Sequence, residues 1–383
     1  MVTVAWFAAP VMVTTDADLV THDMKLLFLT KRRPQGKDLM TRPYGRFYYL
    51  PRELAELGHT VTVVMLSHQF CPPSHRQHEG IEWISESLLP WGPWPYWKRL
   101  RSLIQAQKPD WIIGCSDTYY GILANYWAAR SGAKSLLDAY DNFESYLPWV
   151  LPLHGFWRTA LRRADAITAA GPDLGKLMAA VRIGQDYSVI PMAADPGFQP
   201  MDRNRCRQQF EFLPNKKYVG YSGALSRRRD LSSLFALIDR FANDPDIEFV
   251  LSGRKGAGIV LPEHCRWLGY LQDGRMPVLL NALDVVLVLN KTGAFGNFSY
   301  PVKLYEAMAC QRPVVVSDLP STGWIMRDHR QFLSPAGDVA AAAAKIKQFL
   351  VLRQYDYGIS AGWKDNAKRL LQVLSAASVV NDQ

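Results

Sequence analysis

Two stretches of the sequence place cations where a helix is predicted to begin. In "SYPVKLYEAMA", Pro301 suits the first turn of a helix because its φ is already set, and Lys303 follows within that turn. The positive end of the helix dipole should repel Lys303, so a bound anion would remove the conflict. In "YSGALSRRRDL", Arg227–Arg229 precede Asp230, which can cap a second helix start. Two such helix starts in one half of the chain predict a diphosphate site.

Residues beside the two helix starts fit the same kind of site. Gly223 ends a predicted strand just before the arginines, and the loop "GAFGNFS" contains glycines that permit close backbone approach to a ligand. Glu306 shares a helix face with Lys303, so the two side chains can simply pair with one another. Alternatively, Lys303 binds phosphate and Glu306 accepts hydrogen bonds from ribose hydroxyls. The predicted contacts are Gly223, Arg228, Arg229, Gly296, Asn297, Lys303 and Glu306.

Short apolar segments that alternate with predicted helices must position these residues. From Met24 onward the segments are rich in β-branched residues, which predicts parallel sheets with crossover helices. The pattern lapses into proline, charge and turns around residues 196–215 and then restarts. We therefore expect two doubly wound, Rossmann-like α/β domains at residues 24–195 and 216–350, joined by that linker and followed by a helical segment, 351–383. In such sheets ligands bind beyond the carboxyl ends of the strands, so we expect the site between the domains.

The composition argues against several classes of protein. Hydrophobic residues make up 48% and charged residues 21% of the 383, as in a globular protein. The five cysteines are scattered without a CxxC pair, which favours a reducing compartment over a disulfide framework. His68, His75 and His78 lie in a stretch rich in proline and serine, and we expect exposed loop histidines rather than a metal site. Residues 1–23 lack the basic start of a signal peptide, and the working fold is expected to begin after this extension.

The net charge of +9 indicates either an anionic partner or a solvated basic face. No RNP, KH, helix-turn-helix or zinc-finger pattern is present, so nucleic acid is not the expected partner. Two stretches, "WGPWPYWKRLRSLIQAQ" and "YLPWVLPLHGFWRTALRR", mix aromatic with basic residues, as interfacial helices do at lipid headgroups. The alternative is that the aromatics are core residues beneath a solvated basic face. The first interpretation predicts an anionic-membrane or acceptor surface that contains Trp94, Trp97, Lys98, Arg99, Arg101 and Trp157.

The order of motifs in the second half resembles that of a known enzyme family. "SGALSRRRDL", "FVLSG", "WLGYL" and "SYPVKLYEAMACQRPVVVSD", across about residues 218–318, resemble the second domain of GT-B glycosyltransferases of the GT4-like group. The first half fits through "LAELGHTVTVV" and "VIPMAAD". The resemblance implies a nucleotide-sugar donor in the C-terminal domain, with Arg229 and Lys303 at the diphosphate and Glu306 at the ribose. Many members that retain the anomeric configuration carry a second Glu eight residues before this one, where this chain has Phe298.

A transferase that inverts the anomeric centre needs a general base, which should come from the opposite domain. In "LLDAYDNFESY", Asp138 and Asp141 lie at the carboxyl end of a predicted strand. The stretch is similar to one in membrane-associated inverting GT-B enzymes such as the xanthan glucuronosyltransferase, where an aspartate at a strand end is the base. The likeness favours Asp141, ahead of Asp138, Glu144 and Asp117, although Asp141 can also cap the next turn with Asn142.

Together these features predict an enzyme that transfers a sugar from a nucleoside diphosphate sugar to a lipid-linked or polysaccharide acceptor. The expected place is the inner face of the cytoplasmic membrane, in cell-envelope or exopolysaccharide synthesis. No DxD pair follows a predicted strand, and arginine, lysine and helix dipoles can neutralise a leaving diphosphate, so neither a metal nor another cofactor is expected. Two alternatives are a sugar-nucleotide epimerase of the same fold and a non-catalytic sugar-binding relative.

Overall fold

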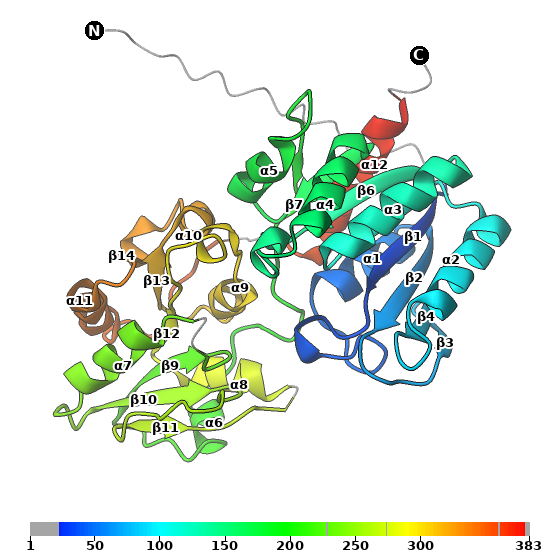
Figure 1. Cartoon of the computed structure of the whole chain (residues 1–383). Helices are drawn as coiled ribbons and strands as arrows, with labels where there is room; N and C mark the ends of the chain where they lie inside the picture. The colour runs from blue at the N-terminus through cyan, green and yellow to red at the C-terminus, as the bar shows by residue number, and fades with distance from the viewer. Residues whose placement is uncertain (1–22, 227–228, 273, 359–360, 380–383) are drawn as a thin grey trace, which may run out of the picture.

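The computed structural model describes residues 23–226, 229–272, 274–358 and 361–379, which form two α/β domains (Figure 1). Residues 1–22, most of the predicted extension, lie outside this part of the chain. Each domain has a parallel sheet with helices around it, which confirms the expected pair of Rossmann-like domains. In the part of the chain that the structure describes, no helix is long and apolar enough to cross a bilayer.

Within the described residues, the first domain is built on an eight-stranded sheet with the order β3-β4-β2-β1-β5-β6-β7-β8. β3 runs antiparallel to β4 at one edge, and the other pairs are parallel. Alternate residues of β1 enter two different clusters of buried side chains, so the sheet is covered on both faces. The strands are β1 (Lys25–Lys31), β2 (Thr60–Ser67), β3 (Ser74–His78), β4 (Ile81–Ser87), β5 (Trp111–Cys115), β6 (Lys134–Ala139), β7 (Ala166–Ala169) and β8 (Ser188–Val189).

The described part of the second domain holds a parallel sheet of six strands with the order β11-β10-β9-β12-β13-β14. In each sheet the strand order reverses once, between β1 and β5 in the first domain and between β9 and β12 in the second. Such a reversal opens a crevice at the carboxyl ends of the strands, where ligands bind. The strands are β9 (Lys217–Ser222), β10 (Ile247–Ser252), β11 (Cys265–Trp267), β12 (Val285–Val288), β13 (Val314–Asp318) and β14 (Leu333–Pro335).

Helices cover both faces of the first sheet. On one face, α2 (Trp94–Gln107) and α3 (Thr118–Ser131) pack on the central strands, and α4 (Leu151–Arg163) packs beside α3 (Figure 1). Elsewhere in this domain α1 (Arg46–Glu56) packs against α12 (Trp363–Val379). Because α12 follows the second domain in the sequence, the C-terminal helical segment returns to the first domain.

The remaining helices belong mainly to the second domain. They are α5 (Pro172–Ala179) in the first domain and α6 (Arg203–Gln208), α7 (Leu231–Arg240), α8 (Arg275–Ala282), α9 (Val302–Ala309), α10 (Pro320–Ile325) and α11 (Val339–Phe349) after it. α6 lies inside the predicted linker and packs on α8. Arg203 and Arg207 both bind the buried carboxylate of Asp284, at 2.8 and 2.6 Å. This stretch is therefore attached to the second domain and is not a free connection.

The histidines that were expected in a loop lie partly in a strand. His75 and His78 belong to β3, at the edge of the first sheet, and His68 follows β2. Polar residues suit an exposed edge strand because they discourage pairing with other chains, and such a strand resembles a loop in composition. The loop prediction is thus wrong for His75 and His78. His75 Nε2 lies 2.9 Å from Oε1 of Glu82 on the neighbouring strand.

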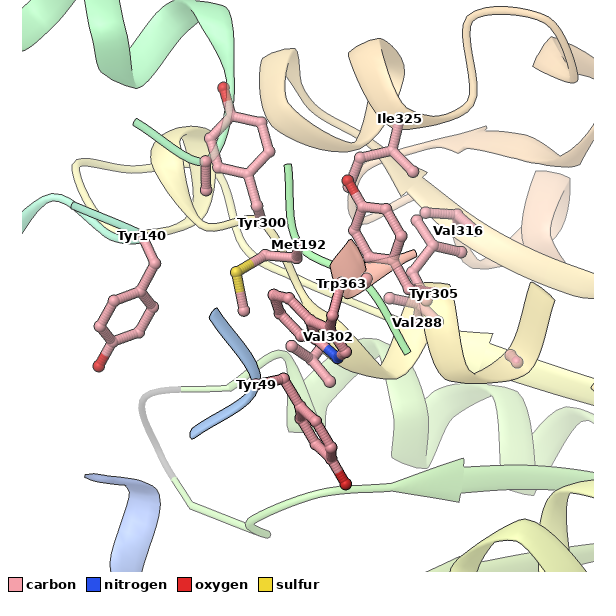
Figure 2. Packing of buried hydrophobic residues seen from close by; sticks show 14 of the residues in the cluster. Tyr49, Tyr140, Met192, Val288, Tyr300, Val302, Tyr305, Val316, Ile325 and Trp363 are labelled. Atoms are coloured by element: carbon pink, nitrogen blue, oxygen red, sulfur yellow. The ribbon is translucent and has the colours of Figure 1, made fainter. Parts of the chain in front are cut away.

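Buried side chains from both domains pack together where the domains join (Figure 2). Tyr49 of α1 and Trp363 at the start of α12 stack, with ring centroids 6.1 Å apart. Tyr300, just before α9, packs directly on the backbone of Gly171, where an added Cβ would lie 2.0 Å from the tyrosine Cε1. Only glycine permits this approach. The contact fixes the start of α9 against the first domain.

Breaking a buried ion pair in the first domain should lower stability strongly. Arg46 Nη2 lies 2.6 Å from Asp138 Oδ1, and the two side chains are only 1% and 7% exposed. We expect Arg46→Ala to lower the free energy of unfolding by about 3–5 kcal/mol, because it leaves the carboxylate buried and unpaired. Urea unfolding followed by circular dichroism measures the change. The matched control is Arg158→Ala, at the exposed pair with Glu144, which should cost under about 1 kcal/mol. An equally small loss for Arg46→Ala would contradict the prediction.

Candidate active site

Lys303 lies in the first turn of α9, beside the loop that follows β9. Its Nζ is 4.6 Å from the ring centroid of Tyr221 and 3.7 Å from the position of a Cβ added to Gly223. No carboxylate among the described residues forms an ion pair with Lys303, so the simple Lys303–Glu306 pair is not formed. Burial and the nearby Arg229 lower the pKa of Lys303 to about 7, while Glu306 opposes this change. The Lys303 ammonium group is therefore buried without a carboxylate, among the described residues, that neutralises its charge.

Glu306 is a buried carboxylate on the same helix. It is 7% exposed and has no hydrogen-bond or ion-pair partner within the described residues. Burial and the negative charge of Asp195 raise the pKa of Glu306 to about 7, and Lys37 and Lys303 limit the rise. Buried carboxylates normally have hydrogen-bond partners. Glu306 is thus able to accept hydrogen bonds from a ligand.

The loops around α9 are shaped by glycine and by internal hydrogen bonds. Gly223 has a φ of +145°, which side-chain-bearing residues rarely adopt. Gly296 packs so closely that a Cβ would lie 1.8 Å from the carbonyl oxygen of Lys291. The Asn297 side chain accepts a hydrogen bond from the backbone N–H of Gly293, at 3.3 Å, and so stabilises its own loop. Of these three residues, which were predicted to bind the nucleotide sugar, Gly223 lies beside Lys303. Gly296 and Asn297 make contacts within the second domain that shape their own loop.

The arginines after β9 are only partly described. Arg228 lies outside the described residues. Arg229 precedes α7, and its guanidinium carbon lies 5.3 Å from the ring centroid of Phe295, in the loop before α9. Arg229 also lowers the pKa of both Lys303 and Asp141. The two predicted phosphate cations therefore lie near each other, at the carboxyl edge of the second sheet.

Asp141 follows β6 and faces the second domain. The hydroxyl of Tyr146 donates to its Oδ2 at 2.7 Å, and the side chain is 8% exposed. Burial raises the pKa of Asp141 to about 6, and the side chains of Tyr146 and Ser299 and the charges of Arg229 and Lys31 limit the rise. Ser299 and Arg229 belong to the second domain. The structure therefore brings this carboxylate together with the cationic loop across the domain junction.

The other candidate carboxylates are engaged elsewhere. Asp138 is bound by Arg46, Asp117 Oδ2 lies 3.1 Å from Lys31 Nζ, and Glu144 pairs with Arg158. Asp138 also accepts a hydrogen bond from the Thr168 hydroxyl at 2.6 Å. A carboxylate whose oxygens are held by a cation has fewer free lone pairs for an acceptor hydroxyl. Among these acids, Asp141 has the environment best suited to proton transfer near neutral pH.

Three residues of the site were not predicted from the sequence. Lys37 lies over the ring of Tyr44, with Nζ 3.3 Å from the centroid. Asp195 accepts hydrogen bonds from the backbone N–H of Gly45, at 3.1 Å, and from Trp363 Nε1, at 3.3 Å. Glu306 interacts electrostatically with Lys37, Tyr44 and Asp195. Asp195 also interacts with Lys37 and with Tyr44. Nothing in the local sequence links these residues, because the contacts form only when the loop after β1 meets the interdomain connection.

The residues predicted to form a membrane or acceptor surface differ in their exposure. Trp94 is 60% exposed, and Lys98 and Arg101 are also exposed. Trp97 packs on Trp127, with ring centroids 4.8 Å apart, so it contributes little to the surface. Arg99 is exposed but pairs with Glu86 at 2.9 Å.

Trp157 does not belong to this surface, and its assignment there was wrong. It is 4% exposed and packs against Gly121, where a Cβ would lie 2.5 Å from its Cζ3. Its neighbour Phe156 is 65% exposed, because adjacent helix residues point in different directions. Trp149 and Leu151 are also largely exposed.

No group of three or more His, Cys, Asp or Glu side chains among the described residues could hold a metal ion. The cations of the candidate site are Arg229, Lys303, Lys31 and Lys37, and its carboxylates include Asp141, Asp195 and Glu306.

Two Rossmann-like domains, each with helices around a largely parallel sheet, make up the fold of the GT-B class of proteins. Residues 202–369 match the family "Glycosyl transferases group 1", and residues 46–193 match the "Glycosyl transferase 4-like domain". The two matches cover most of the chain in the expected order. By these two matches together, the chain belongs to the GT4-like group of glycosyltransferase families, and it has the GT-B fold.

Similar proteins agree with this assignment. A phosphatidyl-myo-inositol mannosyltransferase of Mycobacterium leprae is 34% identical over 121 residues, and the match covers 28% of this chain and 31% of that protein. The chain thus matches about a third of the length of this curated relative. Sucrose-phosphate synthase of Thermosynechococcus elongatus has a similar structure, with a TM-score of 0.68 and 16% identity over 94% of this chain and 98% of that one. Anabaena HepE in complex with UDP and glucose gives a TM-score of 0.65 and 16% identity over 94% and 98%.

Proposed function

We propose that the protein transfers a sugar from a nucleoside diphosphate sugar to a hydroxyl group of an acceptor. The observation that carries this proposal is that Asp141 of the first domain interacts electrostatically with Arg229 of the second, which lies near Lys303, a cation with no ion-pair partner among the described residues. Solved structures of HepE, a protein of the same fold, contain UDP or UDP-glucose, which supports a nucleotide-sugar donor.

Each group has a defined role in this transfer. Arg229 and Lys303 bind the diphosphate and neutralise its charge as it leaves. Glu306 accepts hydrogen bonds from the ribose hydroxyls. Asp141 takes the proton from the acceptor hydroxyl as that oxygen attacks the anomeric carbon, which inverts the configuration there. These cations can neutralise the leaving group without a bound metal, so activity should survive treatment with EDTA.

A thermal-shift panel of UDP-, GDP- and ADP-glucose tests the donor. One of the three should raise the melting temperature, because a ligand at about 100 times its Kd stabilises a protein by about 2.7 kcal/mol. Lys303→Met should reduce the shift at the same donor concentration. The proposal fails if no member of the panel stabilises the wild type. Incubation of the best donor without acceptor then separates transfer from isomerisation, since an epimer of the sugar would indicate an epimerase.

We propose further that the acceptor is lipid-linked or a polysaccharide and is reached at an anionic membrane, the inner face of the cytoplasmic membrane. Because α2 and α4 each follow a parallel strand, both begin at the carboxyl edge of the first sheet, where Asp141 also lies. Trp94 and Leu151 mark these two helix starts and are 60% and 70% exposed. Exposed Lys98 lies within 5.4 Å of the Trp94 ring. Exposed aromatics beside cations are typical of membrane interfaces.

Flotation with vesicles that contain anionic phosphatidylglycerol measures this association. The variant Trp94→Ser/Lys98→Glu should bind at least about fivefold less, since one cation near such a surface contributes about 1 kcal/mol. The matched control, Val351→Ser/Lys347→Glu, changes an exposed apolar and an exposed basic residue of the second domain and should float like the wild type. Equal flotation of all three proteins, or none of the wild type, would contradict a membrane surface here.

A further inference from the structure

Residues 294–299 of the second domain, which we call the clasp, contact the first domain directly. Asn142, next to the proposed base, donates a hydrogen bond from its side chain to the carbonyl of Ala294 at 3.1 Å. The ring of Phe295 lies 6.3 Å from that of Tyr146. The clasp belongs to the second domain and therefore contacts, across the domain junction, the segment of the first domain that contains Asp141.

Two aromatic rings, those of Phe295 and Tyr146, connect the cation to the base. Phe295 contacts Arg229 of its own domain, at 5.3 Å from the guanidinium carbon, and Tyr146 of the other domain. The Tyr146 hydroxyl in turn donates to Asp141 at 2.7 Å. The phosphate side and the acid-base side of the site are thus connected through Phe295.

The far end of the clasp also acts on the base. The Ser299 side chain is only 6% exposed and favours the charged form of Asp141, which lowers the pKa of that carboxyl. The charges that face Asp141 are those of Arg229, from the second domain, and Lys31, from the end of β1. A carboxylate has about four lone-pair directions, so Tyr146 and Ser299 leave capacity for an acceptor hydroxyl.

The clasp is held in one shape by its own domain. The backbone N–H of Gly293 donates to the Asn297 side chain at 3.3 Å, and the Ser321 hydroxyl donates to the Gly296 carbonyl at 3.2 Å. The close packing of Gly296 on Lys291 leaves no room for a side chain. Because the loop is fixed in the second domain, its contacts with the base depend on how the two domains meet.

We propose that Ser299 and Phe295 are positioning residues that ready Asp141 for proton transfer when the two domains come together. This inference rests on the proposed role of Asp141 as the base. Ser299 orients the carboxylate and keeps it ionised in a buried setting. Phe295 contacts both Arg229 and Tyr146 and so fixes their positions relative to one another. Asp141, which accepts the hydrogen bond from Tyr146, then faces the sugar whose diphosphate Arg229 binds. The base is then assembled from both domains, and separation of the domains leaves it incomplete.

Removal of the Ser299 hydroxyl should raise the proton affinity of the base. A carbon-13 NMR titration of protein labelled at the aspartate carboxyl carbon measures this, with the Asp141 signal assigned by its loss in Asp141→Asn. We expect the pKa of about 6 in the wild type to rise by about one unit in Ser299→Ala, because the charged form loses a donor. Ser299→Thr keeps a hydroxyl and should restore the wild-type value. Equal melting temperatures establish that the variants are folded.

Kinetics separate a positioning role from a merely structural one. With the donor chosen from the panel, Phe295→Ala should lower kcat about tenfold, whereas Phe295→Tyr should keep most of it. An unchanged Asp141 titration in Ser299→Ala, or full activity in Phe295→Ala, would overturn the clasp proposal and leave the base intact. If Asp141→Asn is itself fully active, the proposed base fails instead. Should Ser299→Ala melt early, the comparison of Ser299→Thr with Ser299→Cys decides the point, because only threonine keeps the hydroxyl.

Discussion

Replacement of Asp141 by asparagine is expected to lower kcat for sugar transfer by about 10²–10⁴-fold, the usual contribution of a general base. Asparagine has nearly the same shape and can still accept the hydrogen bond from Tyr146, but it cannot take a proton from the acceptor. Donor affinity should stay within about threefold, because the diphosphate contacts lie on the other domain. Initial rates of nucleoside diphosphate release and isothermal titration of the donor measure the two quantities.

The same role predicts a dependence on pH. The base must be ionised, and burial raises the pKa of Asp141 to about 6. With the donor saturating, the value of kcat/KM for the acceptor should therefore be constant above about pH 6 and fall about tenfold per pH unit below it. Asp117→Asn is a suitable control, because that carboxylate pairs with Lys31 and takes no part in the transfer. If Asp141→Asn loses less than about tenfold in kcat, another group is the base.

Substitution of Lys303 by methionine is expected to weaken donor binding by about 10–150-fold. A hydrogen bond to a charged group contributes about 1.5–3 kcal/mol, and each 1.36 kcal/mol is a factor of about ten in affinity. The loss should be seen equally with the nucleoside diphosphate alone, since Lys303 is proposed to bind phosphate and not the sugar. Isothermal titration at constant ionic strength measures it. Wild-type affinity in Lys303→Met would contradict the assignment of this residue to the diphosphate.

Donor affinity should also pass through a maximum near pH 7. In the free protein the pKa values of Lys303 and Glu306 are both about 7. Phosphate favours the charged lysine, so affinity should fall as pH rises above about 7 and the free lysine loses its proton. Ribose hydroxyls favour the charged carboxylate, so affinity should also fall as pH drops below about 7.

Two variants separate the limbs of this profile. Lys303→Arg stays charged throughout and should remove the alkaline limb. Glu306→Gln cannot titrate and should remove the acidic limb. A profile in which either variant keeps both limbs would show that other groups control donor binding.

Local features of the sequence were enough to predict part of the site. The proline and lysine at the start of α9, and the spacing from Lys303 to Glu306, follow from helix geometry alone. The alternation of apolar strands and helices likewise predicted both sheets. These inferences depend on residues close together in the chain, where backbone geometry determines what lies near what.

The remaining features depend on contacts between distant parts of the chain. The approach of Asp141 to Ser299, and of Lys37 to Glu306, arises from the docking of one domain on the other. Trp157 was assigned to a surface because its neighbours are aromatic and basic, but the small Gly121 on α3 admits it to the core. Composition cannot distinguish an exposed helix face from a buried one in a stretch so rich in aromatics.

A crystal structure with the nucleoside diphosphate glucose that stabilises the protein in the thermal-shift panel would show where the donor binds. We expect diphosphate oxygens within hydrogen-bond distance of Lys303 Nζ and Arg229, ribose hydroxyls on the Glu306 carboxylate, and the anomeric carbon facing Asp141. A nucleotide bound elsewhere, or a diphosphate that contacts neither cation, would contradict the proposed site.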